Sequence, residues 1–440
     1  MLKAAAAKVA ITPESPSFLL GYPHVPRIST GTHDELTAQM LYLENGSSRL
    51  LLISLDLLML DRENALYLRR VLADATNLPE QGIFVGCTHT HSGPVTVKNI
   101  SFEADPLTPP TDMAYFHRIC QRMAKCAATL PDSAVGAELA WGSTLIENFG
   151  GNRIAVDGPC DPEAGILAVR SASDGKLISV MMNYSVHPTV MHEDSKLFSA
   201  DYPFYARKEL LEHFNPDMAI PFLLGCAGNQ SPRYYVRAQT FAEAERLGRI
   251  LGSGVAKKLD EMLGEPGLWQ SDPVLAGAIT EVEMVKRDFP PVSVAEARLK
   301  DAVETFERLK RENAGHGKIR TAECAVFGAE ESVYMSRCGE TGELQAVQES
   351  KRIADQHTLR IGDAFLVGLP GEIFVEYALK IKRKAARKCF VASLVNGELQ
   401  GYIVTQKDAE AGGYEAWNAC FGPESGDRLV KAALAKVAEL

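Results

Sequence analysis

The sequence predicts an α/β fold, with one large domain in which helices cover a mixed β-sheet. Near-continuous apolar runs alternate with segments that repeat apolar residues on a helical period. Such runs indicate strands buried on both faces, and their alternation with helices is typical of the α/β class. Several runs also end in histidine or another ligand-type side chain, which predicts a metal site at the strand ends.

The strand-like segments set the layout of the chain. Four apolar runs are predicted as buried strands, and they cover residues 49–60, 82–91, 176–188 and 218–230. Apolar residues on a helical period between or after these runs predict helices over 61–76, 201–214 and 242–263. In the C-terminal third, strand-like runs return over 357–372 and 388–405.

The strongest helical pattern covers residues 293–313. Ser293 followed by Glu296 fits a capping box at its start. One apolar stripe then follows the helical period and consists of Leu299, Val303, Phe306 and Leu309. We interpret this segment as a packing helix. No internal repeat or low-complexity linker divides the chain, so we expect one domain over 1–440, with 266–345 as a peripheral elaboration.

The composition excludes several classes of protein. The formal net charge is −10 and no long basic run occurs, so we expect no nucleic-acid partner. Nine cysteines without a C-x-x-C pair predict reduced thiols and a cytoplasmic protein. No stretch of about 18 apolar residues runs without a charge, so we expect no transmembrane segment.

Ligand-type side chains follow the ends of three predicted strands. His89 and His91 close the run 82–91, His187 closes 176–188, and Glu372 lies where an apolar run meets Pro-Gly. On an extended strand the two rings of an H-x-H pair point to the same face, so both can approach one centre. Neutral imidazoles with a carboxylate form a common set of zinc ligands. The pattern alone leaves a second interpretation open, in which these are turn residues.

A resemblance to a known family adds to this pattern. Seven short motifs occur in order: "THTHSGP", "NYSVHPT", "FSADYP", "NQSPR", "LPGEIF", "GYIVT" and "YEAWNACFGP". With the opening "ITPESPSFLLGYP", they resemble the catalytic domain of the neutral ceramidases, the non-lysosomal ceramidase family. The similarity covers almost the whole chain and is weakest over 235–355. Any one of these motifs is weak evidence, but their common order is specific.

The resemblance implies a zinc-dependent amidohydrolase and assigns roles to named residues. The implied zinc ligands are His89, His187, Glu372 and Tyr402. The implied catalytic groups are His91, a proton-transfer group, and Arg153, Ser231 and Tyr414, which could stabilise an oxyanion.

The sequence departs from the family pattern in three places. Ser-Pro after Arg153 is replaced by Ile-Ala, and an Asp and an Asn around Ser231 are replaced by Asn229 and Arg233. These changes weaken the roles of Arg153 and Ser231. We also expect no C-terminal immunoglobulin-like domain.

The expected activity is cleavage of an amide bond by water that zinc activates. A substrate smaller and more soluble than ceramide is favoured, because aromatic residues make up 8% of the chain and its three tryptophans are dispersed. The partner is then a small-molecule or lipid amide. Three alternatives stay open: a genuine ceramidase, a metal-free serine hydrolase with Ser231 as nucleophile and His91 as base, and a non-catalytic metal-binding protein. The serine hydrolase lacks support from a G-x-S-x-G motif.

Overall fold

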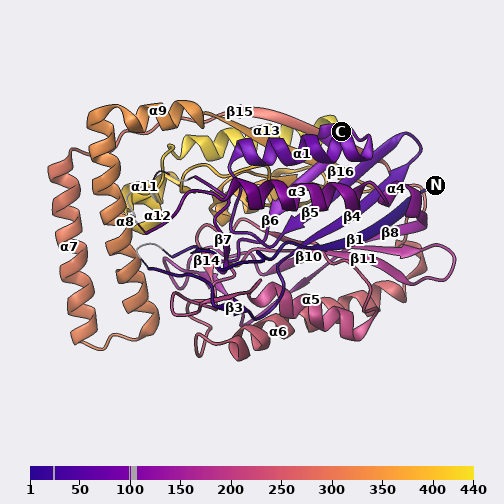
Figure 1. Cartoon of the computed structure of the whole chain (residues 1–440), viewed down its shortest axis with the longest axis horizontal. Helices are drawn as coiled ribbons and strands as arrows, with labels where there is room; N and C mark the ends of the chain where they lie inside the picture. Colours follow the sequence, from indigo (N-terminus) through magenta and orange to yellow (C-terminus); the bar gives the residue numbers. More distant parts are fainter. Residues whose placement is uncertain (23–24, 99, 101–106) are drawn as a thin grey trace.

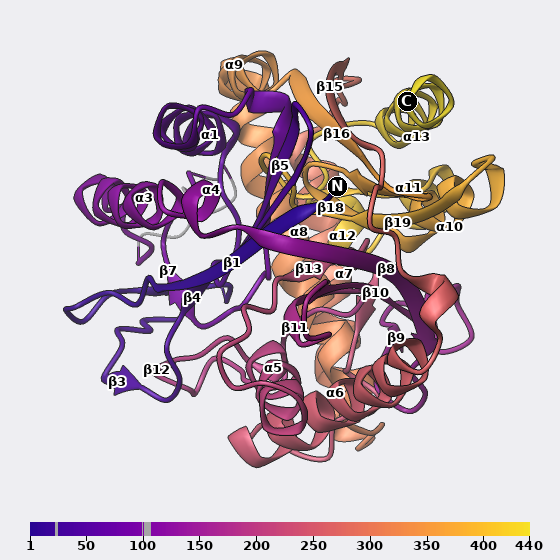
Figure 2. The same cartoon turned by 90° about the vertical axis from the view of Figure 1, so that its right-hand side faces the viewer.

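The computed structural model describes residues 1–22, 25–98, 100 and 107–440. Two β-sheets lie face to face, and helices cover the outer face of each (Figures 1 and 2). This arrangement confirms the predicted α/β class, with a large mixed sheet covered by helices. It also places an apolar layer on both faces of each sheet.

The larger sheet has eight strands in the order β13-β11-β10-β8-β1-β4-β5-β6. Its strands are β1 (Lys3–Ala10), β4 (Thr37–Asn45), β5 (Ser48–Leu55), β6 (Ile83–Cys87), β8 (Val135–Leu145), β10 (Glu163–Ser171), β11 (Leu177–Tyr184) and β13 (Phe222–Leu224). The pairs β5–β6 and β11–β13 are parallel and the other pairs are antiparallel. The sheet is therefore mixed, as predicted.

The smaller sheet has four strands in the order β15-β16-β17-β19. These are β15 (Leu275–Glu283), β16 (Ile353–Ile361), β17 (Ala364–Gly368) and β19 (Lys388–Ala392). The described residues also form four two-stranded sheets, with two residues in each strand. They pair β2 (Leu19–Leu20) with β7 (Gly93–Pro94), β3 (Gly31–Thr32) with β12 (Leu197–Phe198), β9 (Gly151–Asn152) with β14 (Gln230–Ser231), and β18 (Glu372–Ile373) with β20 (Tyr402–Ile403).

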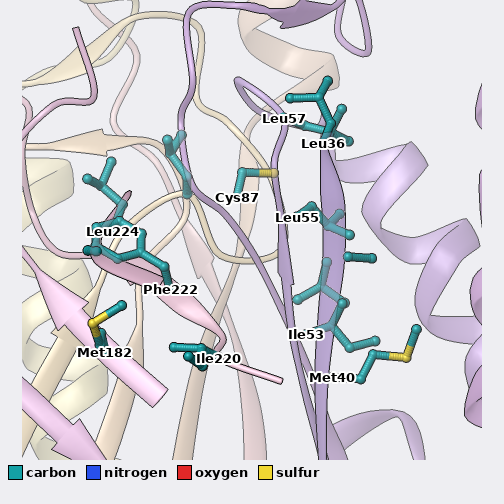
Figure 3. Packing of buried hydrophobic residues seen from close by; sticks show 14 of the residues in the cluster. Leu36, Met40, Ile53, Leu55, Leu57, Cys87, Met182, Ile220, Phe222 and Leu224 are labelled. Carbon is teal, nitrogen blue, oxygen red and sulfur yellow. The ribbon is translucent and has the colours of Figure 1, made fainter. Parts of the chain in front are cut away.

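Burial on both faces explains the near-continuous apolar runs. In β4, Met40 and Tyr42 belong to the core under the helices, whereas Leu41 and Leu43 belong to the core between the two sheets. Alternate residues of one strand thus enter different cores. Figure 3 shows part of the core on the helix side, where strands β4 and β5 approach β11 and β13.

Helices α1 (Arg62–Thr76), α3 (Met113–Ala127), α5 (Tyr202–His213) and α6 (Phe241–Leu263) cover the larger sheet (Figure 1). Asp61, Asp112 and Thr240 cap the first turns of α1, α3 and α6. Helices α10 (Val375–Lys384) and α13 (Glu424–Glu439) pack on the smaller sheet. The other helices in the described part of the chain are η1 (Glu80–Gly82), α4 (Leu130–Ser133), η2 (Pro266–Leu268), α9 (Glu343–Ser350), α11 (Gln406–Ala411) and α12 (Tyr414–Trp417).

Helices α7 (Val292–Arg311) and α8 (His316–Thr341) form a hairpin at one end of the molecule (Figure 1). The predicted helix over 293–313 is confirmed, but its capping box is wrong. The helix begins after Pro291 without a side-chain cap, and Glu296 instead pairs with Arg337 of α8 at 3.0 Å. The predicted stripe is also only partly buried, since Val303 is 41% exposed. No helix in the described part of the chain is long and apolar enough to cross a membrane.

Candidate metal centre

His89 and His91 lie beyond the end of β6, in a turn. Strand β6 ends at Cys87, and His89 has a φ of 68°, in the left-handed region. The expectation of an extended strand through His91 was therefore wrong. The turn is held because the His89 N–H donates to Leu57 O at 2.9 Å. Even so, the Nε2 atoms of His89 and His91 approach to 3.4 Å.

Two short strand pairs bring the other candidate residues to the same place. In β18–β20, Glu372 and Tyr402 are direct register partners. In β9–β14, Ser231 lies opposite Gly151, and the Arg153 N–H donates to Asn229 O at 2.8 Å. Residues that are far apart in sequence thus become neighbours through the backbone.

The closest contacts of the centre converge on one carboxylate. Oε2 of Glu372 lies 3.2 Å from His89 Nε2 and 3.0 Å from His187 Nε2. One ring nitrogen from each of His89, His91 and His187 forms a group whose members all lie within 4.8 Å of one another. His89 and His187 are fully buried, and His91 is half-buried.

Backbone carbonyls orient the three imidazoles. Each Nδ1 has a carbonyl partner, which is Leu58 O at 2.9 Å for His89, Gly21 O at 2.9 Å for His91 and Ala227 O at 2.7 Å for His187. A carbonyl oxygen only accepts, so Nδ1 carries the proton and the Nε2 lone pairs face the centre. Gly21 is required here, because its φ is 123° and a Cβ would lie 2.5 Å from the His91 ring.

These donors fit a small divalent cation. Two imidazole lone pairs at 3.4 Å repel each other unless a proton or a cation lies between them. Donors of a tetrahedral zinc site, about 2.0–2.1 Å from the ion, lie roughly 3.3 Å apart. The three contacts among His89, His91, His187 and Glu372 measure 3.0–3.4 Å. Two or three imidazoles with one carboxylate are an ordinary ligand set for such an ion.

Burial sets the protonation states that metal binding needs. It lowers the pKa of His187 to about 4 and lowers the pKa of His91 well below its usual value. Both imidazoles are therefore neutral near pH 7. For Glu372, burial acts to raise the pKa, and positive charge on His89 and His187 outweighs burial and lowers the pKa. Because His187 is neutral near pH 7, a cation bound at the centre would have to supply that positive charge.

Tyr402, Tyr414 and Arg153 form a layer beside the donors. The two tyrosine rings lie 5.6 Å apart, and the guanidinium carbon of Arg153 lies 5.4 Å from the Tyr402 ring centre. Burial raises the pKa of both tyrosines, so their hydroxyls stay protonated unless a cation lies against them. Nε of Arg153 donates to Glu415 at 2.7 Å, whereas its buried Nη2 has no hydrogen-bond partner among the described residues.

A cavity of about 90 Å³ opens beside this layer. Five of the candidate residues line it, namely His91, Arg153, Ser231, Tyr402 and Tyr414. The donors His89, His187 and Glu372 lie in the interior next to His91. All eight candidate site residues therefore lie at or beside one centre. Ser231 Oγ accepts from the Arg233 N–H at 3.3 Å, and no hydrogen bond joins it to a histidine in the described part of the chain.

Helix α8 supplies one wall of the cavity, a position that was not expected from the sequence. The segment 266–345 was expected at the periphery, yet its residues His316, Arg320, Cys324 and Phe327 line the cavity. Their spacing of four, four and three residues places them on one helix face, a signal present in the sequence. Arg233, which follows the "NQSP" motif, also lines the cavity and was not assigned a role.

Comparisons with known proteins identify the fold. No family model matches this chain, and no curated protein matches its sequence. Among the solved structures that match, two are similar over the whole of this chain. Neutral ceramidase from Pseudomonas aeruginosa gives a TM-score of 0.75 at 19% identity, with 75% of that chain covered. A ceramidase described as complexed with C2 gives 0.77 at 18% identity, with 76% covered. The chain therefore has the fold of neutral ceramidase, as the sequence motifs predicted.

Proposed function

We propose that this chain is a zinc-dependent amidohydrolase that cleaves a small, soluble N-acyl compound. One observation carries the proposal: three inward-facing imidazoles and Glu372 converge beside a cavity in a chain with the neutral ceramidase fold. We further propose that the chain works as a single catalytic domain over 1–440.

His89, His187, Glu372 and Tyr402 would hold the zinc ion. Bound zinc supplies Lewis-acid chemistry, polarising a carbonyl and lowering the pKa of water to about 7. Tyr402 is a ligand only when the cation lowers the pKa that burial has raised. His91 is the alternative third imidazole, since its Nε2 lies 3.4 Å from His89 Nε2.

The remaining residues move the proton and stabilise charge. His91 is neutral, lines the cavity and presents Nε2 inward, so it can take a proton from the attacking water. The water oxygen bonds to the amide carbon, the C–N bond breaks, and His91 returns the proton to the departing amine nitrogen. The unpartnered Nη2 of Arg153 and the protonated hydroxyl of Tyr414 are suited to donate to the oxyanion.

The cavity supports a substrate smaller than a two-chain lipid. Its volume is about 90 Å³, and Arg153, Arg233 and Arg320 line it. A lipid amide needs a long apolar channel for an acyl chain, whereas this cavity is small and three arginines contribute to its wall. The similarity to solved ceramidases favours a second candidate, hydrolysis of ceramide itself.

Metal content and turnover test the proposal together. Purified protein should contain about one zinc per chain by plasma mass spectrometry. Dialysis against a chelator should abolish hydrolysis of short N-acyl compounds, and added zinc should restore it. Glu372→Ala should lose the metal, whereas Glu410→Ala, at an exposed glutamate, should keep it. Activity that survives complete metal removal would overturn the zinc mechanism and favour Ser231 as a nucleophile.

Substrate choice needs its own measurement. The short N-acyl compounds should be hydrolysed with a higher kcat/KM than ceramide presented in detergent micelles. Equal or better turnover of ceramide would establish the second candidate. A zinc-loaded protein without hydrolysis of either class would instead favour a metal-binding protein without catalysis.

A further inference from the structure

The three arginines of the cavity differ in how their charges are balanced. Nε of Arg153 donates to Glu415 at 2.7 Å, and Arg320 pairs with Glu193 at 3.1 Å and Glu323 at 2.7 Å. Arg233 forms no ion pair with any residue that the structure describes. One cation in the cavity wall thus has no counterion.

Neutral acceptors hold the Arg233 guanidinium in place. Nη1 lies 3.0 Å from Thr321 Oγ1 and 3.4 Å from Arg153 O, and Nη2 lies 3.3 Å from Cys324 Sγ. Thr321 and Cys324 belong to α8, so the side chain is fixed between the β14 segment and the helix. Arg233 is half-buried, and removing a charge from water without a partner costs free energy. The site is therefore rigid, cationic and open to the cavity.

We propose that Arg233 selects substrates that carry a carboxylate on the same small molecule as the cleaved amide. This inference rests on the proposed function and names its substrate class. A guanidinium binds a carboxylate through two parallel N–H donors, which gives direction as well as charge. Because Arg233 and Arg153 are in contact and line one small cavity with His91, the carboxylate lies within a few bonds of the amide.

Charge balance favours a carboxylate over a phosphate. A phosphate carries about −1.5 to −2 charges near pH 7, and only one unpaired arginine faces the cavity among the described residues. A carboxylate carries a single charge and matches it. The whole chain has a net charge of −10, so long-range attraction does not draw an anion to the cavity. The local charge of Arg233 has to do so.

Two matched pairs of compounds test this inference. N-acetylglycine and its neutral isostere N-isobutylacetamide place the carboxylate on the amine side. Succinic acid mono-N-methylamide and 4-methyl-N-methylpentanamide place it on the acyl side. Hydrogen bonds between the Arg233 guanidinium and a carboxylate should raise the kcat/KM of one acid about tenfold to hundredfold above that of its isostere. Calorimetry on metal-free protein should show a similar difference in binding affinity. The pair that shows the difference identifies the side that bears the carboxylate.

Variants assign the preference to the residue. Arg233→Met should abolish the difference in kcat/KM between acid and isostere, mainly through a higher KM for the acid. Arg233→Lys keeps the positive charge but lacks the two parallel N–H donors of the guanidinium, so it should retain part of the preference for the acid. Arg237→Met, at an exposed arginine four residues on, is the matched control and should retain all of it.

The outcomes separate this inference from the proposed function. If an acid binds in an Arg233-dependent manner but is not hydrolysed, the proposed hydrolase function would be contradicted and the anion site supported. Hydrolysis in which acids and isosteres are equal in wild-type protein would overturn the anion site and leave the hydrolase standing. That comparison needs no variant, so a poorly folded Arg233→Met does not weaken it. Neither binding nor turnover of any of the four compounds would overturn both.

Discussion

Carbonyl oxygens, not carboxylates, orient the imidazoles of the centre. Each of His89, His91 and His187 has its Nδ1 against a backbone oxygen. A carbonyl fixes the tautomer and the ring plane without adding charge. Glu372 is then the one anion that contacts these rings among the described residues. With neutral imidazoles, the donor set therefore carries one negative charge, from Glu372, to balance against a bound divalent cation.

His91→Ala should separate metal binding from catalysis. We expect the variant to keep its zinc and to lose about 10²–10⁴-fold in kcat, since positioned acid–base groups contribute that much. Plasma mass spectrometry and steady-state kinetics on the same sample measure both quantities. His213→Ala, at a side chain that is 49% exposed, should leave both unchanged. Loss of zinc from His91→Ala would show that His91 is a ligand, which its 3.4 Å contact with His89 permits.

At the scale of elements, α8 joins the hairpin to the site. Gly328 of α8 faces α12, where a Cβ would lie 2.7 Å from Tyr414 Cα and 3.0 Å from Tyr414 O. Both of these are backbone atoms, which cannot move aside as a flexible side chain would. The close packing of the two helices therefore sets the position of Tyr414.

Gly328→Ala should displace Tyr414 and lower activity. Overpacking of this kind costs about 1–3 kcal/mol of folding free energy, and the shift of α12 should reduce kcat. Gly339→Ala is the control in the same helix, because its Cβ would meet only the Leu344 side chain at 3.8 Å. That variant should gain about 0.5–1 kcal/mol from helix propensity. Denaturant unfolding and kinetics on both variants provide the comparison, and equal behaviour would contradict the packing argument.

Glu331 of α8 should make stability depend on pH. Burial, together with Glu330 and Glu372, raises its pKa to about 8, against about 4.3 in an unfolded chain. Between these values the folded chain binds a proton that the unfolded chain lacks, so the free energy of unfolding falls as the pH rises. Glu331→Gln should remove that loss and stabilise the protein by about 1–3 kcal/mol at pH 9, with little effect at pH 4.

Urea unfolding at pH 4, 7 and 9 measures this effect. The control is Glu340→Gln, at an exposed glutamate of the same helix that does not contribute to the raised pKa of Glu331. Its difference from the wild type should be small at every pH. A Glu331→Gln variant whose stability follows the wild-type pH profile would show that Glu331 is ionised in the folded chain.

The length of an apolar run predicted some elements better than others. The run 49–60 gives β5, and 176–188 gives β11. The run 218–230 forms β13 and, at its last residue, the start of β14, because Gly228 and Asn229 turn the chain between the two strands. The pairs β9–β14 and β18–β20 are two residues long, too short for a periodic signal. The donors could be named from the sequence, but their contacts depend on these pairs.

At the scale of the whole molecule, the core between the sheets joins the two halves of the chain. Leu41, Leu52 and Leu167 of the larger sheet share it with Leu359 and Leu366 of the smaller one. All of these side chains are fully buried. The position of Glu372 relative to His89 therefore depends on how the two sheets pack.

Leu359→Ala should destabilise the whole protein. Removal of a fully buried leucine side chain costs about 2–5 kcal/mol, because a cavity remains. Leu145→Ala, at a leucine that is 66% exposed in β8, should change stability by less than about 0.5 kcal/mol. Denaturant unfolding measures both variants. If Leu359→Ala and Leu145→Ala lose similar free energies of unfolding, the packing of the two sheets does not depend on the Leu359 side chain.

The span of sequence between the donors has a consequence for biosynthesis. His89 and Tyr402 are 313 positions apart, because 402 minus 89 is 313. A ribosome adds about 5–20 residues per second, so roughly 15–60 s pass after His89 is made before Tyr402 is joined to the chain. A nascent polypeptide that captured zinc during this interval would hold it with an incomplete set of ligands. Under the proposed assignment, the full set of four ligands therefore exists only once Tyr402 has joined the chain, so stable metal binding would follow synthesis of that residue.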